Sequence, residues 1–218
     1  MKPAVERQVV LPWTQVVRIS FNALRARLFR SLITTATLVL AGAFVAYTFA
    51  GYAILNGLWP HAPAELKEKI LSSGYESFAG SFGSTPKDRW LIALSLLVCT
   101  VGIVNAQLMA VTERFREIGT LKCLGALDSF VIKLFVLEAA YQGLLGGALG
   151  SLLGVMVSTG TLFIKFGTGV LRHWPVGHLA WIVCWNTGLA MVLSFTGVLY
   201  PAWVAARMEP ALALRTEQ

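Results

Sequence analysis

The sequence predicts an all-α integral membrane protein with four transmembrane helices. Hydrophobic residues make up 56% of its 218 residues, charged residues make up only 13%, and the mean hydropathy is +0.67. This apolar share is larger than a soluble domain of this size usually carries. Four apolar runs also reach the length of about 20 residues that is needed to cross a bilayer.

The predicted spans cover residues 31–55, 90–112, 131–164 and 179–203. The first run follows arginines at positions 18, 25, 27 and 30, and no small-residue cleavage site closes it. The first run is therefore interpreted as a retained span and not as a signal peptide. All four spans and their connections are assigned to a single domain, residues 1–218.

Ahead of the first span, residues 11–29 are predicted to form an amphipathic helix. Its apolar residues recur at helical spacing on one face, at Val17, Phe21, Leu24 and Leu28. Arg18, Asn22 and Arg25 follow one residue later, on an adjoining face. Such a helix is expected to lie in the membrane interface, with its arginines toward anionic lipid head groups. It is either an elbow that moves the first span or a simple anchor.

The distribution of basic residues predicts that both termini are cytoplasmic. With four spans, the termini and the loop after the second span share one side of the membrane, which carries twelve Lys and Arg residues. The opposite side carries six. Because cytoplasmic loops carry the basic excess, the net charge of +7 reflects orientation and does not predict nucleic-acid binding.

Two loops are predicted on the outside, residues 56–89 and residues 165–178. The first is expected to contain one short helix, Ala64–Leu71, with Glu65 favouring its N-terminal end. About 34 residues without cysteine cannot bury an independent core, so this loop is expected to rest on the membrane or on a partner. The second loop holds two histidines in an aromatic setting, and no metal site is assigned to it.

The third span is rich in glycine. Gly146, Gly150 and Gly154 form one stripe, and Gly143 with Gly147 forms a second small-xxx-small pair. Small residues allow helix backbones to approach closely in a membrane. The sequence leaves open whether these stripes pack within one subunit or form a dimer interface.

The same span contains one carboxylate, Glu138, near its cytoplasmic boundary and close to Lys133. A charged residue inside a membrane helix is costly and is usually paired or functional. A proton relay would need further acidic residues deeper in the membrane, and residues 134–164 contain no other charged residue. The predicted role of Glu138 is therefore structural, in an ion pair or a hydrogen bond.

No catalytic or metal-binding motif is recognised in the sequence. It contains no GxxxxGK[ST] loop, no HExxH and no GxSxG. No catalytic residue, metal ligand or cofactor site is assigned, and the chain is not predicted to be an enzyme. Work against a gradient would then take its energy from another chain.

Three segments of the chain carry a resemblance to a known family. They are ERFREIGTLKCLGA followed by Leu137–Ala139 and GLLGGALG, the C-terminal YPAWVAARMEPALALR, and the opening FNALRARLFRSLIT. This pattern resembles the FtsX/MacB-type (type VII) permeases of ABC transporters. Cys123 and Trp203 depart from the residues usual there. The short outside loop lacks the large folded domain of MacB-like and lipoprotein-releasing relatives.

The resemblance implies that residues 113–127 form a cytoplasmic coupling helix between the second and third spans, docking on a separate ATPase subunit. The residues implied at this interface are Glu113, Arg114, Arg116, Glu117, Ile118, Leu121, Lys122 and Leu124. Gly119 and Gly125 would allow the chain to turn there. The alternative is a solvated loop placed by the positive-inside rule. The cytoplasmic tail, residues 204–218, is either a second ATPase contact or a membrane-surface cap.

The partners implied are two copies of an ABC ATPase, which bind ATP and Mg, a second permease subunit in a homo- or heterodimer, and membrane lipids. The implied location is the bacterial inner membrane. The expected function is movement of a lipid-like, lipoprotein or amphiphilic substrate. The alternative is a regulatory subunit acting on an extracytoplasmic partner such as a cell-wall hydrolase.

Overall fold

A computed structural model describes residues 13–75, 77–78, 81–123, 128–172 and 174–207, and most side chains from Leu32 onward. The chain divides into two compact units, Met1–Ile33 and Thr34–Gln218. The boundary falls inside the first helix. Everything described below on packing concerns the second unit.

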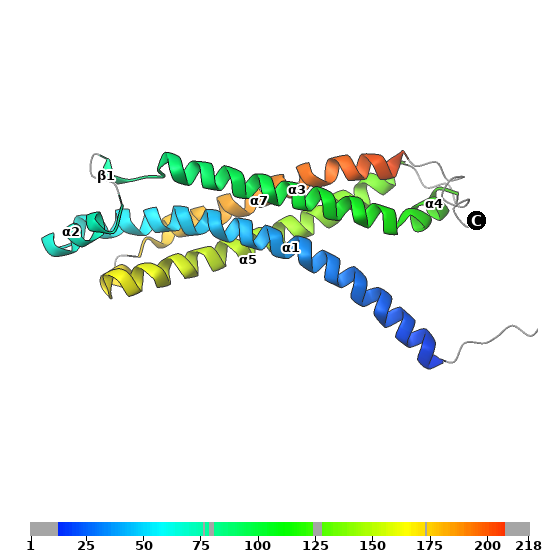
Figure 1. The fold of residues 1–218 in the computed structure, drawn as a ribbon, viewed down its shortest axis with the longest axis horizontal. Coiled ribbons are helices and arrows are strands. Elements are labelled where there is room, and N and C mark those ends of the chain that lie inside the picture. Colours follow the sequence, from blue (N-terminus) through cyan, green and yellow to red (C-terminus); the bar gives the residue numbers. More distant parts are fainter. Residues whose placement is uncertain (1–12, 76, 79–80, 124–127, 173, 208–218) are drawn as a thin grey trace, which may run out of the picture. The chain divides into compact units, whose positions relative to one another are not determined.

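The described chain is almost entirely helical (Figure 1). Its elements are α1 (Trp13–Leu58), the 3-10 turn η1 (Trp59–His61), α2 (Ala64–Ser72), β1 (Ser77–Phe78), β2 (Ser81–Phe82), α3 (Pro86–Glu113), α4 (Phe115–Cys123), α5 (Asp128–Phe166), α6 (Gly169–Arg172) and α7 (Val176–Ala206). The segment predicted as an interfacial helix is helical from Trp13 and continues into the first span. Residues 11–12 and the tail 208–218 lie outside the described residues.

Four helices are long and apolar enough to cross a membrane, which confirms the predicted fold class. They are Leu32–His61, Pro86–Glu113, Val131–Phe166 and Val176–Ala206. Each extends beyond its predicted span at one or both ends. α3, for example, starts at Pro86 behind a capping box, in which Thr85 and Asp88 exchange side-chain-to-backbone hydrogen bonds.

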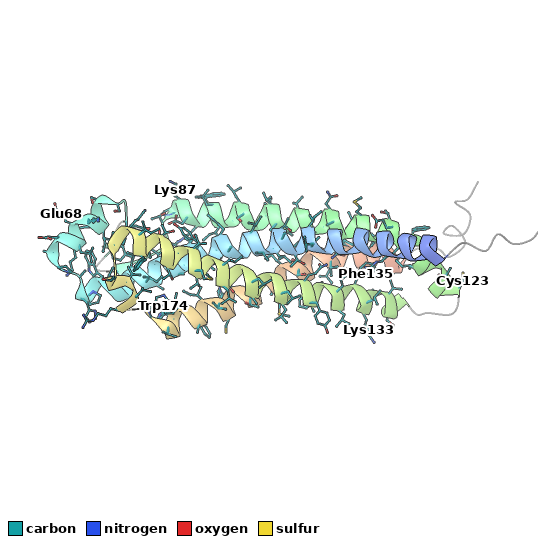
Figure 2. The ribbon with its side chains drawn as sticks, turned by 90° about the horizontal axis from the view of Figure 1, so that it is seen from below. Glu68, Lys87, Cys123, Lys133, Phe135 and Trp174 are labelled. Atoms are coloured by element: carbon teal, nitrogen blue, oxygen red, sulfur yellow. The ribbon has the colours of Figure 1, made fainter. Side chains whose placement is uncertain are left out.

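The two ends of the second unit differ. α2 and β1 lie near one end of the helices and α4 lies at the other (Figure 1). Figure 2 shows the same division, with Glu68, Lys87 and Trp174 toward one end and Cys123 and Lys133 toward the other. The connections predicted as extracytoplasmic therefore gather together, opposite the coupling segment.

The predicted loop helix is confirmed as α2, with Glu65 in its first turn. The loop packs on the chain's own helix ends. Ile70 and Phe82 are buried against Leu55 and neighbouring apolar side chains of α1, α5 and α7. The Asn56 side chain also makes two hydrogen bonds with the Phe82 backbone, donating to its carbonyl at 2.9 Å and accepting from its N–H at 2.7 Å.

Glycine in the left-handed conformation terminates two helices. Gly74, with a φ of 85°, follows α2, and Gly167, with a φ of 79°, follows α5. The Gly167 N–H donates to the Phe163 carbonyl at 2.8 Å. This carbonyl lies in the last turn of α5, where carbonyls lack partners within the helix. The chain can then turn into the short connection that leads to α7.

Candidate coupling site and helix interfaces

The chain turns directly from α3 into α4 at Arg114. Arg114 is the C-cap of α3 and donates its backbone N–H to the Ala110 carbonyl at 3.1 Å. Its own carbonyl accepts from the Ile118 N–H at 2.9 Å, within the first turn of α4. With a single residue between the two helices, the orientation of α4 depends on the end of the second span.

Arg114 also ties this turn to α5. Its guanidinium donates to Glu138 Oε2 at 2.9 Å, and the two side chains are only 26% and 27% exposed. The pair gives the membrane-boundary carboxylate the counter-charge that it needs. Glu138 is therefore ion-paired, and its partner is Arg114 rather than the nearby Lys133, whose side chain is exposed.

Ile118, implied above as an apolar contact for an ATPase, is buried within its own chain. It is 4% exposed and belongs to a buried cluster with Val111, Phe135 and Ala202, from three different spans. Figure 2 shows Phe135 at this end of the helices. The reason is geometric, because α4 lies against the ends of the spans and turns this residue inward. Ile118 thus anchors α4 to its own chain.

Of the other predicted coupling residues, only some have side chains among the described residues. Glu113 is exposed at the end of α3. The backbone of Arg116, Glu117, Leu121 and Lys122 is helical, while their side chains lie outside the described residues, as does Leu124 altogether. Gly119 was expected at a turn but lies buried inside α4. Gly125 falls in the undescribed residues 124–127.

The first glycine stripe of α5 packs against α1. A Cβ built on Gly150 would lie 2.6 Å from the Val39 carbonyl oxygen, and one built on Gly146 would lie 2.7 Å from the Leu38 Cβ. Gly154 likewise faces the α1 backbone. Because a real Cβ is essentially never found closer than 3.0 Å to such an atom, this backbone approach requires glycine.

The second stripe packs against α7. A Cβ on Gly143 would lie 2.9 Å from the Met191 Cα, and one on Gly147 would lie 2.9 Å from the Thr187 Cα. The two glycine stripes therefore place α5 between α1 and α7 of the same chain. The contacts that the structure gives both stripes are intramolecular.

Polar side chains reinforce these crossings. Asn186 on α7 is buried and donates to the Gly42 carbonyl of α1 at 2.9 Å. Ser194, also on α7, donates to the Ala139 carbonyl of α5 at 2.7 Å. Such bonds hold helices together where lipid provides no hydrophobic drive between them.

Gln107 and Gln142 form a third crossing that sequence reasoning missed. The Gln107 side-chain amide on α3 donates to the Gln142 Oε1 on α5 at 3.1 Å, and both residues are buried. The available signal was the presence of polar residues within otherwise apolar runs, because such residues normally face the bundle interior.

The C-terminal motif forms the end of α7 as far as Arg207. Pro201 lies inside the helix and is buried, which removes one backbone hydrogen bond at that point. The Arg207 guanidinium lies 4.3 Å from the ring centroid of Trp203, the residue that departs from the family pattern. This cation–π contact places the basic group against the helix end. Pro210 and the tail lie outside the described residues.

Comparison with known proteins supports the resemblance carried by these segments. Residues 90–210 match the FtsX-like permease C-terminal family. A macrolide export ATP-binding/permease protein MacB of Syntrophobacter fumaroxidans is 32% identical over 161 residues, which cover 73% of this chain and 22% of that protein. MacB of Escherichia coli K12 is 38% identical over 133 residues, covering 57% of this chain and 18% of that protein.

An uncharacterised ABC transporter permease of Methanocaldococcus jannaschii is 34% identical over 130 residues, 57% of this chain and 31% of that protein. The chain thus spans less than a third of each of these relatives. The family match nevertheless covers more than half of the chain and includes the turn at Arg114, both glycine stripes and the end of α7. The chain therefore belongs to the FtsX-like permease family, as an ABC transporter permease of the FtsX/MacB type.

Proposed function

We propose that this chain is the membrane subunit through which a separate ATPase moves a lipid-like, lipoprotein or amphiphilic substrate across or out of the membrane. The observation that carries the proposal is the attachment of α4 to the spans. The Arg114–Glu138 ion pair and the burial of Ile118 connect α4 to α5 and α7 at the end predicted to be cytoplasmic. A displacement of α4 would therefore be transmitted directly into the transmembrane helices.

The ATPase, in two copies, would supply ATP and Mg and dock on α4. Its docking residues would be charged residues of α4, in particular Glu117 and Lys122. Charges of both signs provide register and orientation at an interface. Arg114 and Ile118 would instead transmit the motion from within the permease.

This division of roles is tested by co-expressing the chain with its ATPase. Charge reversal at Glu117 and Lys122 is expected to reduce co-purification of the ATPase. Arg114→Gln is expected to leave co-purification intact while lowering ATP-driven transport, because docking survives and transmission does not. Unchanged binding and activity after both charge reversals would refute docking on α4.

The proposal also includes a second permease chain, covering the exposed face of α3. In the most apolar 18-residue segment of α3, only 17% is buried, whereas the buried share is 39–50% in the corresponding segments of the other three spans. Asn105, within this span, is exposed. A polar side chain facing lipid is unfavourable, whereas the same amide at a helix–helix contact can form a hydrogen bond.

Cysteine cross-linking tests this pairing in membranes, on a background without the native cysteines. Asn105→Cys is expected to give a disulfide-linked dimer, with itself in a homodimer or with the other permease chain in a heterodimer. Leu152→Cys is the matched control, because Leu152 is also an exposed mid-span residue but lies on α5. Equal cross-linking at both positions would contradict a specific α3 interface.

The location that follows is the bacterial cytoplasmic membrane, with both termini and α4 in the cytoplasm. The excess of basic residues on the α4 side supports this orientation. The connections containing α2 and α6 would then lie outside.

A second candidate is a regulatory subunit that conveys ATPase motion to an extracytoplasmic partner such as a cell-wall hydrolase. The observation that favours it is the folded outer loop, on which Leu71 of α2 is 48% exposed. A photo-cross-linking residue in place of Leu71 distinguishes the two functions. Cross-linking to a hydrolase would favour regulation, whereas substrate accumulation in a deletion strain without such a product would favour transport.

A further inference from the structure

A cavity of about 210 Å³ lies between α1, α3 and α5, toward the end of the helices that carries the folded loop. Its lining combines four aromatic rings with one carboxylate. The rings belong to Phe44, Tyr47, Tyr52 and Tyr75, and the carboxylate is that of Asp88. Tyr75 comes from the loop after α2, so the folded loop completes the wall of this cavity.

Two of the rings form a corner. The ring centroids of Tyr52 and Tyr75 are 6.5 Å apart and their planes are inclined at 88°. The Tyr52 hydroxyl donates to Asp88 Oδ2 at 2.5 Å, which fixes this ring against the carboxylate. Burial raises the pKa of Tyr75, whose phenol is already neutral at physiological pH at its ordinary pKa. The corner is therefore preorganised and carries no charge on its rings.

The carboxylate is held in place by a set of bonds that all use one oxygen. Asp88 Oδ2 accepts from the Thr85 backbone N–H at 2.9 Å and from the Thr85 hydroxyl at 2.6 Å, in addition to the Tyr52 hydroxyl. Oδ1 makes no hydrogen bond with another described residue. The acidic group thus has both a fixed position and one oxygen open to a ligand.

This combination selects for positive charge. The face of an aromatic ring attracts cations, and several rings beside a carboxylate form the kind of cage that binds quaternary ammonium groups. Asp88 is the only charged residue among the described ones that line the cavity. Nearby, Lys165 lies with its Nζ 6.0 Å from the Tyr75 ring centroid, so this ring already attracts a cation on the chain itself.

The cavity also has an apolar side that opens to the outside of the helices. Leu91 lines it and is 43% exposed, and Phe44 is 36% exposed. An apolar chain attached to a bound head group could therefore extend into the bilayer. An engineered cavity of about 150 Å³ is known to admit benzene, so the present one has room for a trimethylammonium group and its first methylenes.

We propose that this cavity, hereafter the aromatic pocket, binds the cationic head of an amphiphile, a quaternary ammonium or protonated amine with an apolar tail. The ligand becomes the transported substrate only if the function proposed above holds. Binding itself needs neither an ATPase nor α4. Loss of ATPase docking would therefore count only against the proposed function, and failure to bind a cationic amphiphile would count only against the aromatic pocket.

The test is direct titration of the purified full chain, in neutral maltoside micelles, with dodecyltrimethylammonium. Saturable binding is expected, together with competition by tetramethylammonium. Dodecanol and dodecyl sulfate have the same tail without a positive charge, and they should not compete. Competition with lysophosphatidylcholine distinguishes the two possible sources of the ammonium group, a lipid head group and a free amphiphile. Competition by it would assign the site to a lipid head group, and its absence to a free cationic amphiphile.

Four variants locate the binding. Asp88→Asn keeps an oxygen for the helix cap but removes the charge, and it should weaken binding about tenfold. Tyr75→Leu should weaken it about fivefold by removing a ring, while Tyr75→Phe should bind like the unmodified chain. Lys165→Met should bind more tightly because a competing positive charge is lost.

Each variant is first checked for an unchanged thermal unfolding midpoint, so that loss of fold is not mistaken for loss of binding. If Asp88→Asn fails this check, the Tyr75 pair and Lys165→Met decide the question. Equal binding of dodecanol, or equal affinities for the Tyr75→Leu and Tyr75→Phe variants, would overturn the aromatic pocket as a cation site.

Discussion

Replacing Gly150 with alanine tests the close packing of α5 against α1. The added Cβ would lie 2.6 Å from the Val39 carbonyl oxygen and 3.1 Å from the Ala43 nitrogen. Ordinary contact begins at 3.4 Å, so the two backbones would have to separate by about 0.8 Å at this point. Both nearby atoms belong to the backbone of a helix, which cannot rotate away as a flexible side chain can.

The magnitude follows from comparison with Gly160→Ala on the same helix. A Cβ on Gly160 meets nothing within 4 Å. Both variants gain the helix propensity of alanine, about 1 kcal/mol over glycine, so their difference isolates the overpacking. That difference is expected to be about 1–3 kcal/mol, with Gly150→Ala the less stable variant.

The assay is reversible unfolding in mixed maltoside and dodecyl sulfate micelles, followed by circular dichroism, with the oligomeric state measured by sedimentation. Gly150→Ala should lower the free energy of unfolding without altering the monomer–dimer equilibrium. Equal stability of the two variants would refute the close approach of α5 to α1. A loss of dimer with unchanged monomer stability would assign the stripe to a subunit interface instead.

Three further predictions concern other contacts. A double-mutant cycle with Arg114→Gln and Glu138→Gln should give a coupling free energy of about 1 kcal/mol in unfolding measurements, and a value near zero would contradict the ion pair. Asn56→Ala should lose the two hydrogen bonds to Phe82, about 1–2 kcal/mol, and so accelerate proteolysis of the loop between α2 and α3. The exposed Cys123 should react with a membrane-impermeant maleimide only after cells are permeabilised, while the buried Cys99 stays unlabelled; labelling of Cys123 in intact cells would invert the topology.

The helices could be predicted because their cause is local. A run without charged residues long enough to cross a bilayer is visible in the sequence itself, and so is the Pro63–Glu65 start of α2. The early start of α3 also has a local signal, the capping-box pattern of Thr85 three residues before Asp88.

The contacts between helices could not be predicted in the same way. The partner of Glu138 is 24 residues distant, and no local rule prefers Arg114 over Lys133, which is only five positions away. The burial of Ile118 against the spans could not be predicted for the same reason, because an amphipathic segment does not reveal which surface its apolar side meets. The spacing of the glycines predicted two stripes but not which helix each one contacts.

The uneven burial of the spans has a consequence for how the helices can move. Interlocked backbones at the glycine stripes prevent α1 and α7 from sliding along α5 without collision. The close contact of α3 at Gly197 is instead with the side chain of Ile103, so here the two helices meet through a side chain and not through both backbones. The second unit thus combines three helices in backbone-to-backbone contact with a fourth, α3, that is held by side chains, among them the buried Gln107–Gln142 pair.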